Sequence, residues 1–175
     1  LESHPAYVPA IVALGMIFQD NGSLASLRPY VRRAMESAPE SVTPHMILAR
    51  LELTLGQPDA VIAAVDTAQT QFGGNADLDH FRGLALLAKG EFQSALRALM
   101  TAASASPGNA AFQFDLAQAQ LANEYFDAAS ESAQAFCGLL PTDIRCPILL
   151  GDIDLAKGDG ASALRHFEAA SEQAW

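Results

Sequence analysis

The sequence predicts an all-α solenoid of about five helix–turn–helix repeats, and three observations carry this prediction. Glycines suited to a tight turn recur at intervals of 34 or 68 residues, at Gly22, Gly56, Gly90 and Gly158. Small residues recur with the same period of 34, at Gly15, Ala49, Gly83, Ala117 and Gly151. The register holds along the whole chain without a gap. A fixed period of this length is typical of stacked helix pairs.

The stretch 75–107 shows how one repeat is built. Asn75 is suited to cap a first helix, because its side chain can accept hydrogen bonds from unpaired backbone N–H groups. Gly90 supplies the turn without a Cβ penalty. A second helix then begins near Glu91 and carries apolar residues at helical spacing. Pro107 ends it, because proline lacks the N–H group that a helix interior needs.

The same positions recur in the other repeats. The capping position is occupied by Ser41, Asn75, Asn109 and Asp143, and an apolar position by Leu27, Val61, Ala95, Ala129 and Ala163. In the fourth repeat, Asn123 and Glu124 replace the turn glycine. We therefore expect residues 1–175 to form a single repeat domain, a piece of a longer repeat protein, with repeats at about 8–41, 42–75, 76–109, 110–143 and 144–175.

The repeat pattern resembles the tetratricopeptide repeat family over nearly the whole chain. Gly83, Ala95 and Pro107 match the small residue, the interlocking alanine and the closing proline of that family. The leucine that precedes the small residue recurs at Leu14, Leu48, Leu116 and Leu150, whereas Arg82 interrupts that series. The resemblance implies a right-handed superhelix whose first helices line a concave groove.

Composition and charge exclude several classes of partner. The chain has ten Lys and Arg against twenty Asp and Glu, a formal charge of -10. This balance argues against nucleic acid, which needs a basic surface, and against anionic membrane surfaces. The sequence contains no run of about 18 apolar residues that would span a membrane, and no secretory signal is visible. The compartment stays open between the bacterial periplasm and the cytoplasm.

The sequence predicts no enzyme, no cofactor and no metal. No nucleotide-binding motif or His-Glu-x-x-His pattern occurs. His45 and His80 fall on neighbouring first helices and could approach one another, either as a metal pair or as two polar side chains. We expect the second, because a metal site needs three or four ligands.

The two cysteines, Cys137 and Cys146, flank the turn at Pro141. They could form a disulfide between the fourth and fifth repeats, which would require an oxidising compartment. They could also be two free thiols that pack as small apolar side chains. We expect the second: cysteines that lie close together and are reduced.

The resemblance places a candidate binding surface on the first helices. Phe114 is its expected central anchor, and Arg50 and Asp152 could fix a partner's direction by charge. For Leu53, Leu87, Leu121 and Leu155, the groove and the packing between helices remain equal alternatives. The predicted groove residues are Met16, Met46, Arg50, His80, Leu84, Phe114, Gln118, Ile148 and Asp152.

Two functions follow from this surface. The first is an interaction scaffold that binds a peptide or helix of a protein partner in its concave groove, because apolar anchors at helical spacing suit helix-in-groove recognition. Its expected setting is a bacterial envelope assembly or export system, by analogy alone. The alternative is a structural spacer, or a module for end-to-end homo-association, with no groove ligand.

Overall fold

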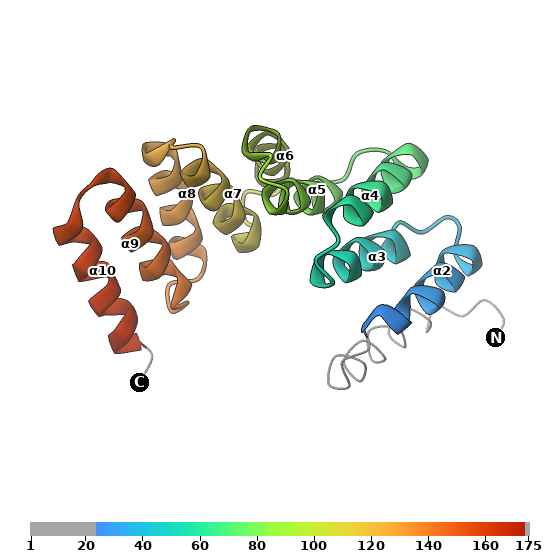
Figure 1. The fold of residues 1–175 in the computed structure, drawn as a ribbon, viewed down its shortest axis with the longest axis horizontal. Coiled ribbons are helices and arrows are strands. Elements are labelled where there is room, and N and C mark those ends of the chain that lie inside the picture. The colour runs from blue at the N-terminus through green and yellow to red at the C-terminus, as the bar shows by residue number, and fades with distance from the viewer. Residues whose placement is uncertain (1–23, 174–175) are drawn as a thin grey trace. The chain divides into compact units, whose positions relative to one another are not determined.

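The computed structural model describes residues 24–173, and between these limits the chain is helical with no strand (Figure 1). A short 3₁₀ helix, η1 (Leu24–Leu27), precedes α2 (Arg28–Ser37). The prediction of an all-α helical-repeat fold is confirmed, and the right-handed sense of the superhelix stays a prediction. The remaining helices are α3 (Thr43–Thr54), α4 (Pro58–Phe72), α5 (Ala76–Ala88), α6 (Phe92–Ala105), α7 (Ala110–Ala122), α8 (Phe126–Leu139), α9 (Arg145–Lys157) and α10 (Gly160–Gln173).

The chain divides into two compact units, which are described separately. In the N-terminal unit, Leu1–Lys89, α3 packs against α2 and α4, and α5 packs against α4. Its larger buried cluster contains Ala49, Val61, Ala64, Val65, Ala68, Leu78, Phe81 and Ala85. A bidentate ion pair of 2.6 Å between Arg28 and the buried Glu52 also links α2 to α3.

The C-terminal unit, Gly90–Trp175, is a series of packed neighbours. Helix α7 packs against α6 and α8, and α9 packs against α8 and α10. The core contains Ala117, Ala129, Ala133, Phe136, Leu149 and Ile153. Alanines fill much of this core because small side chains let two helix backbones approach closely, and the predicted small-residue positions at Ala117 and Gly151 are buried.

Asn75 and Asn109 are the N-caps of α5 and α7, as predicted, whereas α3 and α9 begin one residue later than predicted, after Val42 and Ile144. The Asn75 side chain accepts a hydrogen bond of 2.8 Å from the backbone N–H of Asp77. The side chains of Asn109 and Asp143 accept equivalent bonds of 3.1 and 2.9 Å from the N–H groups of Ala111 and Arg145. These bonds satisfy N–H groups that the helix itself leaves unpaired.

The turns within the repeats share one backbone geometry. Gly56, Gly90 and Gly158 have positive φ values, of 66, 75 and 85°. Glu124, at the equivalent position of the fourth repeat, has φ 62°, and it is the one non-glycine residue with positive φ in the described part of the chain. The side chain of Asn123 donates bonds to the carbonyls of Phe92 and Ala119. The repeat therefore imposes its turn even where glycine is missing.

A disulfide joins Cys137 of α8 to Cys146 of α9, with Cα atoms 5.3 Å apart. The predicted proximity of the two cysteines is confirmed, but the prediction that they are reduced is wrong. The α8–α9 turn brings the two side chains within bonding distance. The bond closes a short loop around Pro141 and fixes the start of α9 to the end of α8.

Candidate functional site

In the N-terminal unit, the predicted groove residues lie at the edge of the core. Met46 is half-buried and packs against the main buried cluster. The Arg50 guanidinium lies 5.9 Å from the ring centroid of Phe81 and is exposed. His80 and Leu84 are half-buried. Met16 lies outside the described residues.

In the C-terminal unit, the predicted groove residues come from α7 and α9. Gln118, Ile148 and Asp152 are exposed, and Ile148 keeps 40% of its surface accessible. Phe114 is half-buried, because its ring packs at 5.1 Å against the ring of Phe136 in the core. Three of these four side chains are therefore exposed on the first helices, whereas Phe114 belongs partly to the core.

Sequence reasoning missed Arg145, which covers the aromatic pair. Its guanidinium carbon lies 4.9 Å from the Phe114 centroid and 5.3 Å from the Phe136 centroid, within the range of cation–π attraction. The Asp143 carboxylate fixes this position, with hydrogen bonds of 3.0 and 2.7 Å from Nε and Nη2 of Arg145. The same contacts lower the pKa of Asp143 to about 2. No repeat position signals this role, since residues 43, 77 and 111 are Thr, Asp and Ala.

The leucine position for which the groove and the packing between helices were equal alternatives differs between repeats. Leu53 and Leu121 are half-buried and pack against the cores of their units. Leu155 is 59% exposed. Ile144, one helical turn before Ile148, is 38% exposed and was also missed. Its spacing of four residues from Ile148 was the signal that would have found it.

The histidines do not form a metal site in the described part of the chain, where no three His, Cys, Asp or Glu side chains gather in a ligand arrangement. His45 is buried and meets Phe72 edge-on, with ring centroids 5.2 Å apart. Burial lowers the pKa of His45, and a backbone hydrogen bond with Ser41 opposes this as the smaller effect. His45 is therefore a core residue in its neutral form.

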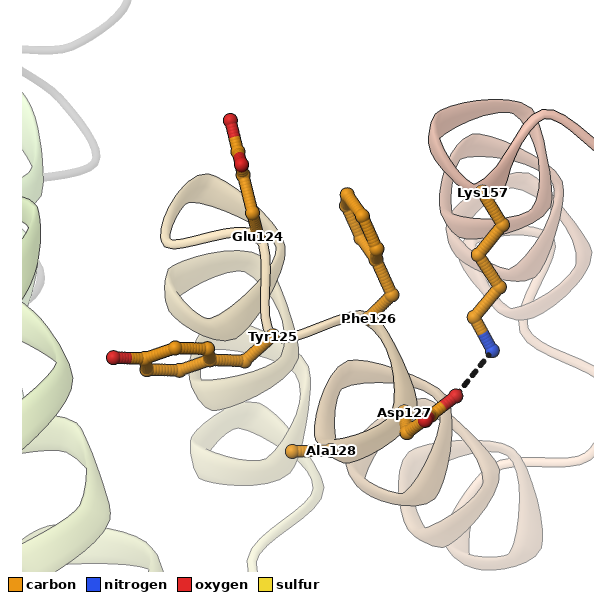
Figure 2. Close-up of a pocket in the computed structure, with 6 residues that line it drawn as sticks. All are labelled: Glu124, Tyr125, Phe126, Asp127, Ala128 and Lys157. Carbon is orange, nitrogen blue, oxygen red and sulfur yellow. Dashed lines mark ion pairs between the residues drawn. The ribbon is translucent and has the colours of Figure 1, made fainter.

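A shallow hollow of about 380 Å³ lies at the turn between α7 and α8 (Figure 2). The one cation in its lining, Lys157, points to Asp127 at 3.1 Å and also donates to Ser130. Its charge is thus already compensated, and the hollow brings no nucleophile together with a base. The lining residues are Glu124, Tyr125, Phe126, Asp127, Ala128 and Lys157.

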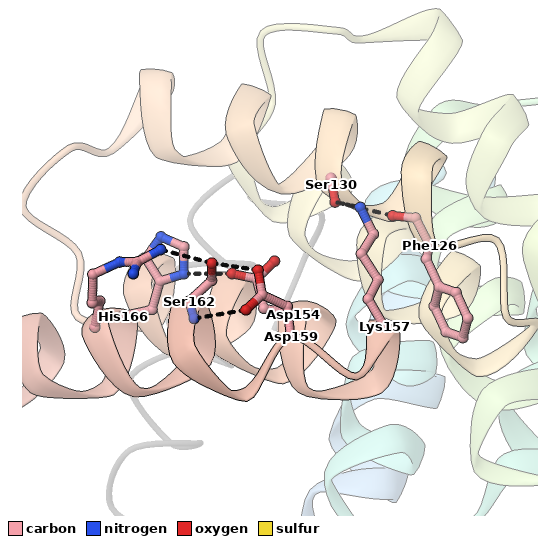
Figure 3. Close-up of polar contacts among 8 residues, drawn as sticks. Phe126, Ser130, Asp154, Lys157, Asp159, Ser162 and His166 are labelled. Atoms are coloured by element: carbon pink, nitrogen blue, oxygen red, sulfur yellow. Dashed lines mark hydrogen bonds and ion pairs between the residues drawn. The ribbon is translucent and has the colours of Figure 1, made fainter.

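Polar contacts between α9 and α10 have a structural role (Figure 3). His166 Nδ1 lies 3.0 Å from the Asp154 carboxylate, which joins the two helices. Asp159 accepts bonds from the N–H and hydroxyl groups of Ser162 at the start of α10. These contacts cap and pair helices.

Comparison with known proteins agrees with this geometry. Residues 82–144 match the family model described as tetratricopeptide repeat. No curated protein sequence matches the chain. A solved structure of MamA from Desulfovibrio magneticus RS-1 superposes with a TM-score of 0.79 at 19% identity, covering 98% of this chain and 96% of that one.

Two further solved structures are similar. One is pilF of Pseudomonas aeruginosa, with a TM-score of 0.78 at 18% identity over 95% of this chain and 76% of that one. The other is TTC0263, a thermophilic TPR protein of Thermus thermophilus, with a TM-score of 0.76 at 20% identity over 95% of this chain and 91% of that one. At these identities the likeness establishes the fold.

The helix pairs, their buried small residues and the repeated turn define a protein of the helical-repeat class. Within that class, residues 82–144 match the tetratricopeptide repeat model, and the chain shares its fold with a solved tetratricopeptide-repeat protein. In the described residues, none of the helices is both long and apolar enough to cross a bilayer.

Proposed function

We propose that the protein is an interaction scaffold whose first-helix surface binds a peptide or helix of a protein partner. One observation supports this most directly: Gln118, Ile148 and Asp152 on α7 and α9 are exposed beside the half-buried Phe114. Solenoids present such surfaces to partners, because each repeat adds a contact of the same kind. Apolar anchors at helical spacing favour a helical or extended protein segment.

The proposed setting is an assembly or export system of the bacterial envelope. The Cys137–Cys146 disulfide supports an oxidising compartment such as the periplasm, because cytosolic thiols are normally kept reduced. In this setting Met46, His80, Phe114 and Ile148 are the proposed contacts, one on each first helix. The affinity of such a surface is expected to be micromolar, because ordering costs remove much of the gain from burial.

Site-specific photo-crosslinking tests this function. A photoreactive amino acid at Gln118, exposed on α7, is expected to capture one discrete partner in bacterial cells. The same amino acid at Met100, which is 49% exposed on α6, is the matched control and should capture none. Phe114→Ala should weaken capture from Gln118, with circular dichroism as the check on folding. A structural spacer predicts equal, non-specific labelling at both positions.

A further inference from the structure

The Cys137–Cys146 disulfide lies next to both groups that cover Phe114. Cys137 directly follows Phe136, whose ring packs at 5.1 Å against the ring of Phe114. Cys146 directly follows Arg145, whose guanidinium carbon lies 4.9 Å from the Phe114 centroid. The bond therefore joins the two positions of the chain that are next to the aromatic cover and the charged cover of this ring.

The ion pair between Arg145 and Asp143 does not join α9 to α8. Its partners are two residues apart, and both lie inside the loop that the disulfide closes. The Arg145 side chain is 50% exposed, and ion pairs of exposed side chains are weak. Leu149 and Ile153 hold later turns of α9 in the core. The start of α9, with Arg145, therefore depends on the disulfide for a covalent link to α8.

The disulfide lies at the edge of the core of the C-terminal unit. Cys137 and Cys146 are both half-buried and pack against that core. Gly138 and Arg145, which are next to them in the chain, are exposed. Exchange of a disulfide requires that a thiolate reaches one of its sulfur atoms. This half-exposed setting therefore favours exchange in the folded protein.

From these observations we propose that Cys137 and Cys146 form a reversible redox site that regulates access to Phe114. A dithiol reductant opens the bond, the start of α9 separates from α8, and Arg145 moves away from the aromatic pair. The oxidised protein is the covered state, and the reduced protein offers Phe114 to a partner. This inference rests on the proposed scaffold function, in which Phe114 is a contact, and adds the regulation of that contact.

The two sulfur atoms differ as leaving groups. Cys146 is the second residue of α9, so N–H groups at the positive end of the helix dipole stabilise its thiolate. Cys137 lies in the last turn of α8, at the negative end. The first thiolate of the reductant therefore attacks Sγ of Cys137, and Cys146 leaves as a thiolate. The second thiol of the reductant then releases Cys137. Two electrons and two protons pass from the dithiol to the cysteines, and the dithiol becomes a disulfide.

Fluorine NMR of the ring measures the cover directly. Para-fluorophenylalanine replaces Phe114, and a soluble paramagnetic agent reports how far solvent reaches the ring before and after reduction with dithiothreitol. Reduction should raise the paramagnetic relaxation rate about twofold, because local opening exposes the ring. The same label at Phe112, on the same helix and 3% exposed, is the matched control and should stay protected. An unchanged rate at Phe114 would overturn the proposal, and so would an equal rise at both positions, because reduction would then unfold the unit.

Arg145→Gln tests whether the guanidinium links the bond to the ring. In the oxidised protein this substitution should raise the relaxation rate at Phe114 about twofold, since it removes the charged cover. Reduction of the variant should add little, because two changes that act through one contact are not additive. Arg165→Gln, which removes the same charge from an exposed site on α10, should leave the effect of reduction intact. Full additivity of Arg145→Gln and reduction would overturn the role of Arg145.

A monothiol identifies the sulfur that is attacked. Brief exposure to glutathione, followed by alkylation of free thiols and mass spectrometry, should find glutathione on Cys137 at least about threefold more often than on Cys146, since the better leaving group is released. A larger share on Cys146 would overturn the assigned order of attack.

Partner capture separates this proposal from the scaffold function. With the photoreactive amino acid at Gln118, the variant Cys137→Ser with Cys146→Ser should capture the partner about twofold to fivefold more strongly than the disulfide-bonded protein, because a larger share of the molecules is competent to bind. Equal capture would overturn the redox control and leave the scaffold function standing. An absence of capture in both proteins, with Phe114 uncovered by reduction, would overturn the scaffold function alone.

Discussion

The ring of Phe167 lies against Gly151 so closely that a Cβ atom on the glycine would be 2.6 Å from the ring's Cε1 atom. The corresponding pair in the preceding repeat is Ala117 and Ala133, both fully buried. A larger side chain on α10 is thus matched by a smaller residue on α9. This exchange of volume keeps the two helices close in a core that tolerates few voids.

This contact predicts that Gly151→Ala has opposite effects on stability in the presence and in the absence of the Phe167 ring. Gly151→Ala should destabilise the protein, because overpacking costs about 1–3 kcal/mol, which exceeds the gain of about 0.5–1 kcal/mol from replacing glycine in a helix. In a Phe167→Ala background the clash is gone, and the same substitution should then stabilise. Chemical denaturation of the four proteins measures both effects. Destabilisation of the same size in both backgrounds would contradict the packing account.

Glu124 gives a prediction about the turn. Its φ of 62° costs a non-glycine residue about 1–2 kcal/mol, so Glu124→Gly should relieve strain. The greater conformational freedom of glycine in the unfolded chain offsets about 0.4–1 kcal/mol of this gain. The expected net gain is therefore between zero and about 1.5 kcal/mol in the free energy of unfolding. The reverse change, Gly158→Glu, is the matched control in the next repeat and should destabilise.

The disulfide gives a third prediction. Cys137→Ser with Cys146→Ser should lower the free energy of unfolding by about 2–3 kcal/mol, because a nine-residue separation closes a loop in the unfolded chain. Thiol titration of the unreduced, denatured protein should find no free sulfhydryl group. Two titratable thiols per chain would contradict the bond. Hydrogen exchange should show the loss confined to the α8–α9 turn, since repeats are coupled mainly to their neighbours.

His45 makes stability depend on pH near neutrality. Burial lowers its pKa in the folded state, so the unfolded chain binds a proton more readily. The contribution of neutral His45 is complete above the unfolded pKa of about 6.5 and is lost as the pH falls towards the lower folded value. His45→Phe should flatten the pH dependence between about pH 7 and 5. A variant with the same slope as the wild type would contradict this assignment.

Asp143 makes stability depend on pH in a separate, more acidic range. Its pKa is lowered to about 2, chiefly by the side chain of Arg145. Its contribution is therefore present above the ordinary carboxyl pKa of about 3.9 and is lost as the pH falls towards the folded value. Asp143→Asn should remove this acid dependence while leaving the dependence due to His45 intact, as acid titration monitored by circular dichroism would show.

The repeat period predicted most of the fold, because turns and caps depend on local chemistry. Asn75, Asn109 and Asp143 accept N–H bonds as predicted. The turn at Glu124 follows the repeat, although its residue type does not favour this conformation. Here the stacking of neighbouring repeats outweighs the local propensity of the residue. This effect of stacking cannot be predicted from any single position.

The candidate site was less predictable, since exposure depends on contacts between helices. The spacing placed Phe114 and Ile148 at equivalent positions, but Phe136 and Arg145 cover much of Phe114. The oxidation state of Cys137 and Cys146 could not be predicted from spacing, because a bond requires Cα atoms at a particular separation. Leu121 and Leu155 share one register and differ only in what covers them.

The disulfide also has a mechanical consequence. A helical array that is pulled from its ends gives way helix by helix and releases chain as it lengthens. The segment between Cys137 and Cys146 cannot be released while their sulfurs are bonded. At about 3.3–3.6 Å per residue the segment extends to roughly 30 Å, so reduction would set free roughly 25 Å beyond the 5.3 Å that the bonded cysteines already span. Tension alone therefore does not extend the chain between α8 and α9 while the disulfide is intact.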